Sequence, residues 1–145
     1  MSAVKSKDTR PELALRKELW RRGLRYRKNY KKLPGKPDIV FPRARLAVFC
    51  DGDFWHGHNW AIRGYGSLEN ELQRYSRAWA DKITRNIQRD ERTNEELEDV
   101  GWKVLRIWES DIKADVKRCG DIVEYAYWDI MRNSSGDEKE YDEDV

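Results

Sequence analysis

Residues 33–58 read LPGKPDIVFPRARLAVFCDGDFWHGH, and this stretch decides the fold. Two apolar runs, residues 39–41 and 46–49, flank a Pro-Arg-Ala-Arg sequence at 42–45. Short apolar runs bounded by turn residues are typical of β-strands. The stretch therefore predicts two strands that fold back on each other as an antiparallel hairpin.

The predicted hairpin brings acidic residues together. If its turn centres on residues 43 and 44, the pairing places Asp38 opposite Phe49 and beside Cys50 and Asp51. Facing strands lie only about 5 Å apart. Residues that are distant in the sequence are therefore expected to be neighbours.

Asp38, Asp51 and the carbonyl of Cys50 would form an oxygen-rich corner at this end of the hairpin. Mg²⁺ takes one or two carboxylates and completes its shell with waters and substrate phosphates, and Mn²⁺ accepts the same ligands. His56 follows as a candidate acid or base. The alternative is that both aspartates have ordinary turn roles, but the nearby histidines and aromatic residues favour a site.

Composition indicates a folded and highly charged protein. The chain has 145 residues, of which 39% are apolar and 39% charged. This length is typical of one domain with one core. We expect a cytoplasmic protein, because no apolar stretch approaches the roughly 20 residues of a membrane span and no signal-peptide pattern is present. Cys50 and Cys119 are then expected to be free thiols.

The net charge of +2 hides an asymmetry along the chain. Residues 1–50 hold 15 Lys and Arg against 4 acidic residues, whereas residues 137–145 hold 6 acidic residues and one Lys. A basic body is suited to a polyanion such as DNA. We predict a single domain over residues 1–132 and an acidic, disordered tail over residues 133–145.

A first helix is predicted from Thr9 to about Arg22, with Gly23 as its end. Thr9 and Glu12 have the spacing of a capping box, and Pro11 is suited to the first turn. Capping explains Glu12 completely. The other interpretation, which stays open, is that its carboxylate also points at the acidic corner.

Two basic segments are candidates for phosphate binding. An alternating pattern over residues 24–30 predicts a strand, and the basic residues in and after it are interleaved with tyrosines, as in surfaces that bind nucleic acid. A helix predicted over residues 68–100 carries a second basic stripe, although surface ion pairs could account for part of it. The candidates are Arg25, Arg27, Lys28, Lys31, Lys32, Lys36, Lys82, Arg85 and Arg89.

The remaining segments complete the predicted order of elements. Residues 57–68 read as a loop, residues 102–108 as a strand and residues 111–131 as a final helix. The order is thus α-β-β-β-α-β-α, with the carboxylates on the second and third strands.

This order, with Pro-Asp on the middle strand, resembles the PD-(D/E)xK nuclease core, which implies an α/β restriction-endonuclease-like fold with a mixed central sheet flanked by helices. More closely, the chain resembles the very-short-patch repair (Vsr-type) mismatch endonucleases. The resemblance covers nearly the whole chain. It rests on SKDT at 6–9 with Glu12, LPGKPD at 33–38, VFCDGDFWH at 48–56, Trp79 with Lys82 and residues 86–90, and GWKVL at 101–105 with Trp108 and Glu109.

The resemblance implies roles for individual residues. Asp38 would be the principal metal ligand, the Cys50 carbonyl the second protein contact, His56 the catalytic histidine and Glu12 an acidic site residue. The aromatic residues implied to wedge into the duplex beside the mismatch are Phe54, Trp55 and Trp79, although tryptophans are more often core residues. Wedging costs least where a base pair is already mismatched.

The sequence departs from the family pattern at three places. The usual lysine of the nuclease core is absent, and Asp51 replaces a family histidine and is expected to bind the metal directly. Asp53 and Trp60 stand where two cysteines of the family's structural zinc would be, which leaves His58 and Cys119 as remaining candidates. We therefore predict a loop packed by aromatic residues and no structural zinc.

The leading hypothesis is a monomeric, Mg²⁺-dependent endonuclease that nicks one strand of double-stranded DNA at a T:G or U:G pair. Its partners would include accessory repair proteins, and no membrane association is expected. One alternative is a less selective restriction-type or mobile-element nuclease. Another is a DNA-binding module on a nuclease core that has lost its activity, which the missing lysine makes credible.

Overall fold

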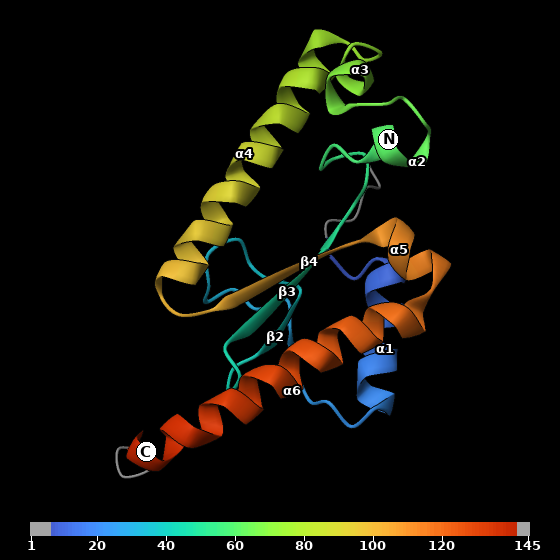
Figure 1. The fold of residues 1–145 in the computed structure, drawn as a ribbon. Helices are drawn as coiled ribbons and strands as arrows, with labels where there is room; N and C mark the ends of the chain where they lie inside the picture. Colours follow the sequence, from blue (N-terminus) through green and yellow to red (C-terminus); the bar gives the residue numbers. More distant parts are fainter. Residues whose placement is uncertain (1–6, 142–145) are drawn as a thin grey trace.

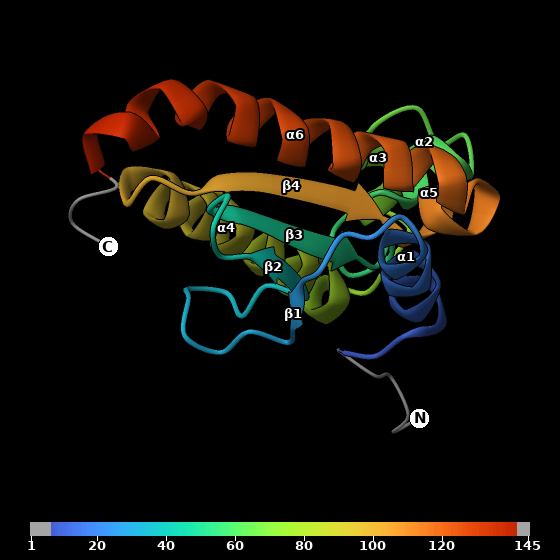
Figure 2. The same ribbon diagram turned by 90° about the horizontal axis from the view of Figure 1, so that it is seen from below.

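A four-stranded sheet forms the centre of the structure, a computed structural model that describes residues 7–141, with side chains to residue 134. The strands follow the order β1-β2-β3-β4 across the sheet (Figure 2). The first three strands pair antiparallel, and β4 pairs parallel to β3. Their bounds are β1 Arg27–Lys28, β2 Ile39–Phe41, β3 Leu46–Asp51 and β4 Lys103–Trp108. The predicted α/β class with a mixed sheet flanked by helices is confirmed.

The hairpin of β2 and β3 has the predicted register. Ile39 pairs with Val48, and the turn is closed by the Ala44 N–H, which donates to the Phe41 carbonyl at 3.1 Å. The Asp38 N–H continues the pairing by donating to the Val48 carbonyl at 3.1 Å. Asp38 therefore lies at the edge of the ladder, next to the end of β3.

Helices cover both faces of the sheet (Figure 1). Because side chains alternate along a strand, β2 and β3 contribute to two separate cores. One packs against α1 (Arg10–Arg21), α5 (Glu109–Ala114) and α6 (Val116–Tyr141), and the other against α4 (Arg77–Asp99). The first core includes Leu15, Leu19, Ile39, Phe41, Leu46, Val48, Ile112 and Val123, and the second Val40, Ala47, Phe49 and Leu97.

The first helix begins and ends as predicted. The Thr9 hydroxyl accepts a hydrogen bond from the Glu12 N–H at 3.3 Å, and Gly23 follows the helix with a φ of 85°. A left-handed residue is a common helix end, and glycine adopts it without steric strain.

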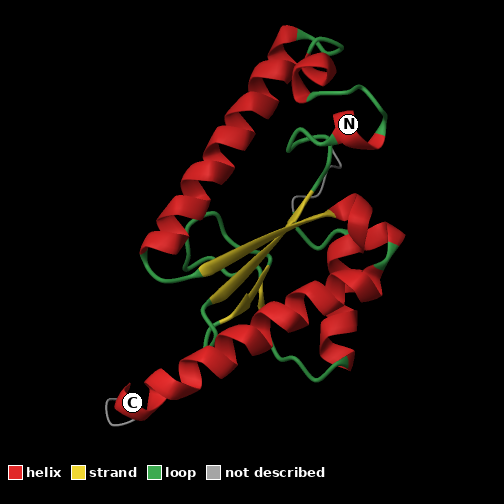
Figure 3. Ribbon diagram, in the orientation of Figure 1, coloured by secondary structure: helices red, strands yellow, loops and turns green. Residues whose placement is uncertain are grey.

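Two predicted helices are each divided in the structure, as the coil between red ribbons shows (Figure 3). The helix predicted over 68–100 is α3 (Leu68–Leu72) followed by α4, because Ser76 caps a new helix by accepting from the Trp79 N–H at 3.3 Å. The final helix begins again after Asp115, whose carboxylate accepts from the Arg118 N–H at 3.1 Å. Both caps satisfy N–H groups that a new helix leaves unpaired.

Two further predictions need correction. The predicted loop 57–68 contains a short helix, α2 (Asn59–Ile62). The predicted strand 24–30 is reduced to β1, because Asn29 takes a left-handed φ of 49° that an extended strand does not allow.

Helix α6 continues beyond the predicted end near Met131 as far as Tyr141. The predicted boundary between residues 132 and 133 lies inside this helix. The division into a domain and a tail stays a prediction, and residues 142–145 lie outside the described part of the chain. Within residues 7–141, none of the helices combines the length and apolarity that crossing a bilayer requires.

Candidate active site

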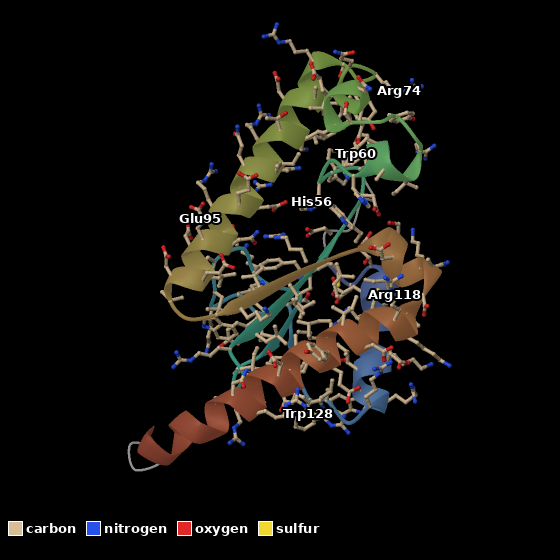
Figure 4. All side chains as sticks on the ribbon, in the orientation of Figure 1. His56, Trp60, Arg74, Glu95, Arg118 and Trp128 are labelled. Atoms are coloured by element: carbon tan, nitrogen blue, oxygen red, sulfur yellow. The ribbon has the colours of Figure 1, made fainter. Side chains whose placement is uncertain are left out.

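A cleft of about 500 Å³ opens at the C-terminal end of β3, between the sheet and α4. Asp38, Cys50, Asp51 and His56 all line it. His56 comes from the segment after β3 and lies between the sheet and α4 (Figure 4). The structure thus brings Asp38 close to Cys50 and Asp51, as the predicted hairpin required, and places His56 in the same cleft.

Asp38 lies at a point where negative charge is crowded. Its Oδ2 accepts a hydrogen bond from the Cys50 N–H at 2.7 Å, and its carboxyl shares a hydrogen bond with Glu12. Burial, together with the charges of Glu12 and Asp51, raises the pKa of Asp38 to about 8. Among the residues that the structure describes, no basic side chain forms an ion pair with Asp38.

Glu12 is buried and combines the two roles that the sequence left open: it takes part in capping the first helix, and its carboxylate points at the acidic corner. Its backbone takes part in the cap of α1, and its carboxylate accepts from the Asp8 N–H at 3.1 Å rather than from the N–H of the capping residue. The carboxylate also pairs with Arg16 at 2.9 Å. It faces Asp38 as well, and burial raises the pKa of Glu12.

Asp51 is held by a residue that the sequence analysis did not select. The Nη1 of Arg106, on β4, donates to the two carboxylate oxygens of Asp51 at 3.1 and 3.2 Å. The Nε of Arg106 donates to Asn94 at 2.8 Å, and the guanidinium lies 4.1 Å from the centroid of the Phe49 ring. The sequence pattern assigned Arg106 only to a face of a strand.

His56 forms a pair with Asp90, a second residue that was missed. Its Nδ1 lies 2.5 Å from Asp90 Oδ2, and its Nε2 lies 3.9 Å from Asp51 Oδ1. Burial alone would lower the pKa of His56, but the Asp90 hydrogen bond and the charge of Asp51 outweigh it and raise the pKa. The ligand atoms of these three residues lie within 4.8 Å of one another, so the group could hold a metal ion.

The sequence pattern places Asp90 on a highly charged helix and assigns it no role in the site. The available signal was its place at the end of the family-like segment 86–90. That segment also supplies Asn86, which donates to the Trp55 carbonyl at 3.0 Å.

The three predicted wedge residues form one aromatic cluster beside the cleft. Ring centroids lie 4.9 Å apart for Phe54 and Trp55, 5.0 Å for Trp55 and Trp79, and 5.2 Å for Phe54 and Tyr75. Trp79 is 45% exposed. The ammonium of Lys82 lies 4.8 Å from the Trp55 centroid, within the range of a cation–π contact.

The predicted basic residues fall into three groups. Lys82, Arg85 and Arg89 line a groove along α4, and Arg89 also lines the cleft. Lys31 and Lys36 line the cleft from the loop that Gly35 brings against Phe49 and Thr93. Arg25, Arg27, Lys28 and Lys32 form the third group, which is exposed and does not line the cleft. Arg25 packs on the Trp20 ring, with its guanidinium carbon 3.6 Å from the ring centroid.

The segment after the aromatic pair is held by a polar cluster. Asp53 pairs with the Nδ1 of His58 at 2.8 Å and accepts from the Ser110 hydroxyl at 2.6 Å. The His58 ring stacks on Trp108 with 4.0 Å between centroids. Cys119 does not join this cluster, because it is buried in the core that includes Leu15 and Leu19.

Sequence comparison relates this chain to DNA mismatch endonucleases and to type II nicking enzymes. A family model described as DNA mismatch endonuclease Vsr matches residues 1–62. The type II nicking enzyme V.NmeDIP of Neisseria meningitidis serogroup C is 43% identical over 129 residues, which cover 89% of this chain and 84% of that relative. The type II nicking enzyme V.HpaIIP of Haemophilus parainfluenzae is 44% identical, over 77% and 75% of the two chains. The DNA mismatch endonuclease Vsr of Escherichia coli (strain K12) is 33% identical, over 81% and 71%.

Proposed function

Because this chain belongs to the Vsr family of DNA endonucleases, we propose that it nicks one strand of duplex DNA at or next to a mismatched or deaminated base, as a monomer acting in DNA repair. The observation that carries this proposal is a single cleft lined by Asp38, Asp51 and His56. An aromatic cluster and a basic helix face lie beside it. T:G and U:G are the pairs that we propose as substrates.

We propose Mg²⁺ as the metal, with Mn²⁺ as a substitute. Asp38, Asp51 and the carbonyl of Cys50 would hold the ion, and Glu12 would support Asp38. These oxygen donors suit Mg²⁺. The Asp38 carboxyl lies near Glu12 and Asp51 and has no ion pair of its own among the residues that the structure describes, so a divalent cation there would relieve the repulsion between like charges. When bound, the ion stabilises the charge that develops on the phosphate during cleavage.

His56 is proposed as the proton donor to the leaving oxygen. Asp90 holds its Nδ1 and leaves Nε2 on the side of Asp51. The hydrogen bond with Asp90 and the charge of Asp51 raise the pKa of His56, which favours its protonated form. A group whose pKa lies near the working pH is suited to general acid catalysis. Asp90 then acts as a positioning residue.

DNA binding is proposed on the surface that surrounds the cleft. Lys31, Lys36 and the α4 residues Lys82, Arg85 and Arg89 would contact phosphates, which fix the register of a protein on the duplex. The remaining basic candidates, Arg25, Arg27, Lys28 and Lys32, would contribute longer-range attraction. Phe54, Trp55 and Trp79 would wedge beside the mismatch, where unstacking costs least.

We also propose that the enzyme needs no structural zinc. Asp53, His58 and Ser110 join the segment after β3 to the start of α5 by hydrogen bonds and a ring stack. Purified protein is expected to carry far less than one zinc per chain by elemental analysis. Asp53→Ala should lower the free energy of unfolding by roughly 1–3 kcal/mol, because buried donors lose their acceptor. One tightly held zinc per chain would contradict this prediction.

A panel of duplexes tests the proposed function. Purified protein with Mg²⁺ is incubated with otherwise identical T:G, U:G and C:G duplexes, and the nicks are mapped on both strands. We expect one strand of the T:G or U:G duplex to be nicked at least about 10-fold faster than the C:G duplex, since a difference of ~1.4 kcal/mol in unstacking cost is sufficient. Equal rates would favour the less selective nuclease, and no cut on any duplex would favour a binding module.

The aromatic wedge has a matched control within the chain. Trp79→Ala should reduce the preference for the mismatched duplex several-fold. Trp128, on α6, is 46% exposed, close to the 45% of Trp79, and lies far from His56 (Figure 4). Trp128→Ala should leave the preference unchanged. If both variants keep the preference, Trp79 is not part of the wedge.

A further inference from the structure

Arg106 has no role in the function proposed above, yet it occupies the acidic corner of the cleft. We propose that its guanidinium takes the place of a second divalent ion, so that the enzyme binds one metal ion at Asp38 and keeps a permanent organic cation between Asp51 and Asp90. This inference rests on the proposed metal dependence and deepens it.

The position of the guanidinium is that of a bridging cation. Nη1 of Arg106 lies 3.1 Å from Asp51 Oδ1, 3.2 Å from Asp51 Oδ2 and 3.5 Å from Asp90 Oδ1. Asp51 and Asp90 are also two of the three residues whose ligand atoms are close enough to share a metal ion. Arg106 therefore already neutralises the carboxylates that such an ion would need.

Several contacts hold Arg106 in this place. Asn94 accepts from its Nε at 2.8 Å, and the Phe49 ring lies 4.1 Å from the guanidinium carbon. The parallel pairing of β3 and β4 sets Arg106 directly opposite Phe49. The side chain is only 19% exposed. A guanidinium that is stacked, hydrogen-bonded and ion-paired on different sides is pre-organised, and a free ion would have to displace it.

The two ends of the cleft differ in charge compensation. At one end, Asp51 and Asp90 face the guanidinium of Arg106 and the ring of His56. At the other end, Asp38 has no ion pair among residues 7–134. A divalent ion is attracted to the second end and repelled by the guanidinium at the first.

Asp51 connects the two cations. An ionised carboxylate offers about four lone-pair sites on two oxygens. Asp51 can therefore accept from Arg106 and still contribute an oxygen to the ion held by Asp38. In this arrangement Arg106 is a positioning residue, because it orients Asp51 and does not itself need to touch the DNA.

Counting bound Mn²⁺ tests the inference independently of activity. The DNA-free protein is titrated with Mn²⁺, and the free ion is measured by electron paramagnetic resonance. We expect one site per chain in the wild type, two sites in Arg106→Ala, and one site in Arg106→Lys, which restores a positive charge. Thermal unfolding of each variant verifies that it is folded.

Two further variants keep the test decisive if Arg106→Ala does not fold. Asp38→Asn should lose the single Mn²⁺ site of the wild type, whereas Asp90→Asn should retain it. Two sites in the wild type, one site in a folded Arg106→Ala, or loss of the site in Asp90→Asn would overturn the role of Arg106. A wild type that binds no Mn²⁺ would instead refute the metal proposed at Asp38, so the two failures are distinguishable.

Discussion

Asp38→Asn is expected to lower the rate of DNA nicking by about 10³-fold or more, because the loss of several kcal/mol of metal-mediated stabilisation corresponds to that factor. Asparagine retains an oxygen that can accept from the Cys50 N–H, so the hairpin keeps its local hydrogen bond. The variant therefore removes the charge with little change in shape. Binding to the same duplex, measured by gel shift without metal, should remain within a few-fold of the wild type.

The same variant should be more stable than the wild type when metal is removed. The pKa of Asp38 is raised from 3.8 to about 8, so folding disfavours its charged form. The metal-free wild type consequently loses stability as the pH rises from about 4 to about 8, because the buried carboxyl must ionise. The asparagine variant has no ionisable group at this position and is not destabilised in this way. At pH 8 in EDTA we expect its melting temperature to be higher by roughly 5 °C, which corresponds to a gain of about 2 kcal/mol for a domain of this size.

Asp81→Asn is the matched control for both measurements. Asp81 is an exposed aspartate on α4 whose ion pair with Arg77, at 4.0 Å, is on the surface. Its replacement should change neither nicking nor melting temperature appreciably, because surface ion pairs contribute only about 0–1 kcal/mol. An Asp38→Asn enzyme that nicks at the wild-type rate would end the assignment of Asp38 as a metal ligand.

His56→Ala is expected to lower the nicking rate by about 10²–10⁴-fold, the typical contribution of a general acid or base. If His56 protonates the leaving oxygen, the loss should depend on the leaving group. A duplex in which sulfur replaces the bridging leaving oxygen provides the test, because a thiolate departs without being protonated. On this substrate the variant should recover most of the lost rate relative to the wild type.

His58 is the only other histidine in the chain and serves as the control. His58→Ala removes a ring that stacks on Trp108 and an ion pair with Asp53, so it should lower stability. Any loss of its activity should be the same on the oxygen and sulfur substrates. Asp90→Asn should reduce the rate less than His56→Ala, by about 10-fold, since it disturbs only the orientation of the ring. An equal loss on both substrates for His56→Ala would exclude the leaving-group role.

Features of this chain that depend on neighbouring residues were predictable from the sequence, whereas others were not. The hairpin register was predictable because side chains alternate between the two faces of a strand. With the turn fixed at its centre, only one pairing of the two strands buries the apolar residues. The cap at Thr9 was predictable because it depends only on the four consecutive residues 9–12. The division at Ser76 was missed, because the apolar period continues through it and only the cap geometry marks a new helix.

The two missed site residues show the same limit. Asp90 meets His56 across 34 positions of sequence, and Arg106 meets Asp51 across 55. Asp90 resembles a surface acid on a charged helix, and Arg106 resembles one more alternating position of a strand. The missing lysine of the nuclease core suggested lost activity, whereas the structure places a different cation, from β4, beside the aspartate that stands there.

The sequence by itself determined the α/β class, the pairing of β2 with β3 and the closeness of Asp38 to Cys50 and Asp51, because turn chemistry and side-chain alternation act over short distances. Only the tertiary structure decided that α4 and β4 complete the acidic corner with Asp90 and Arg106. Which face of a helix or strand meets that corner depends on how the two cores pack against the sheet, and packing is a property of the whole chain.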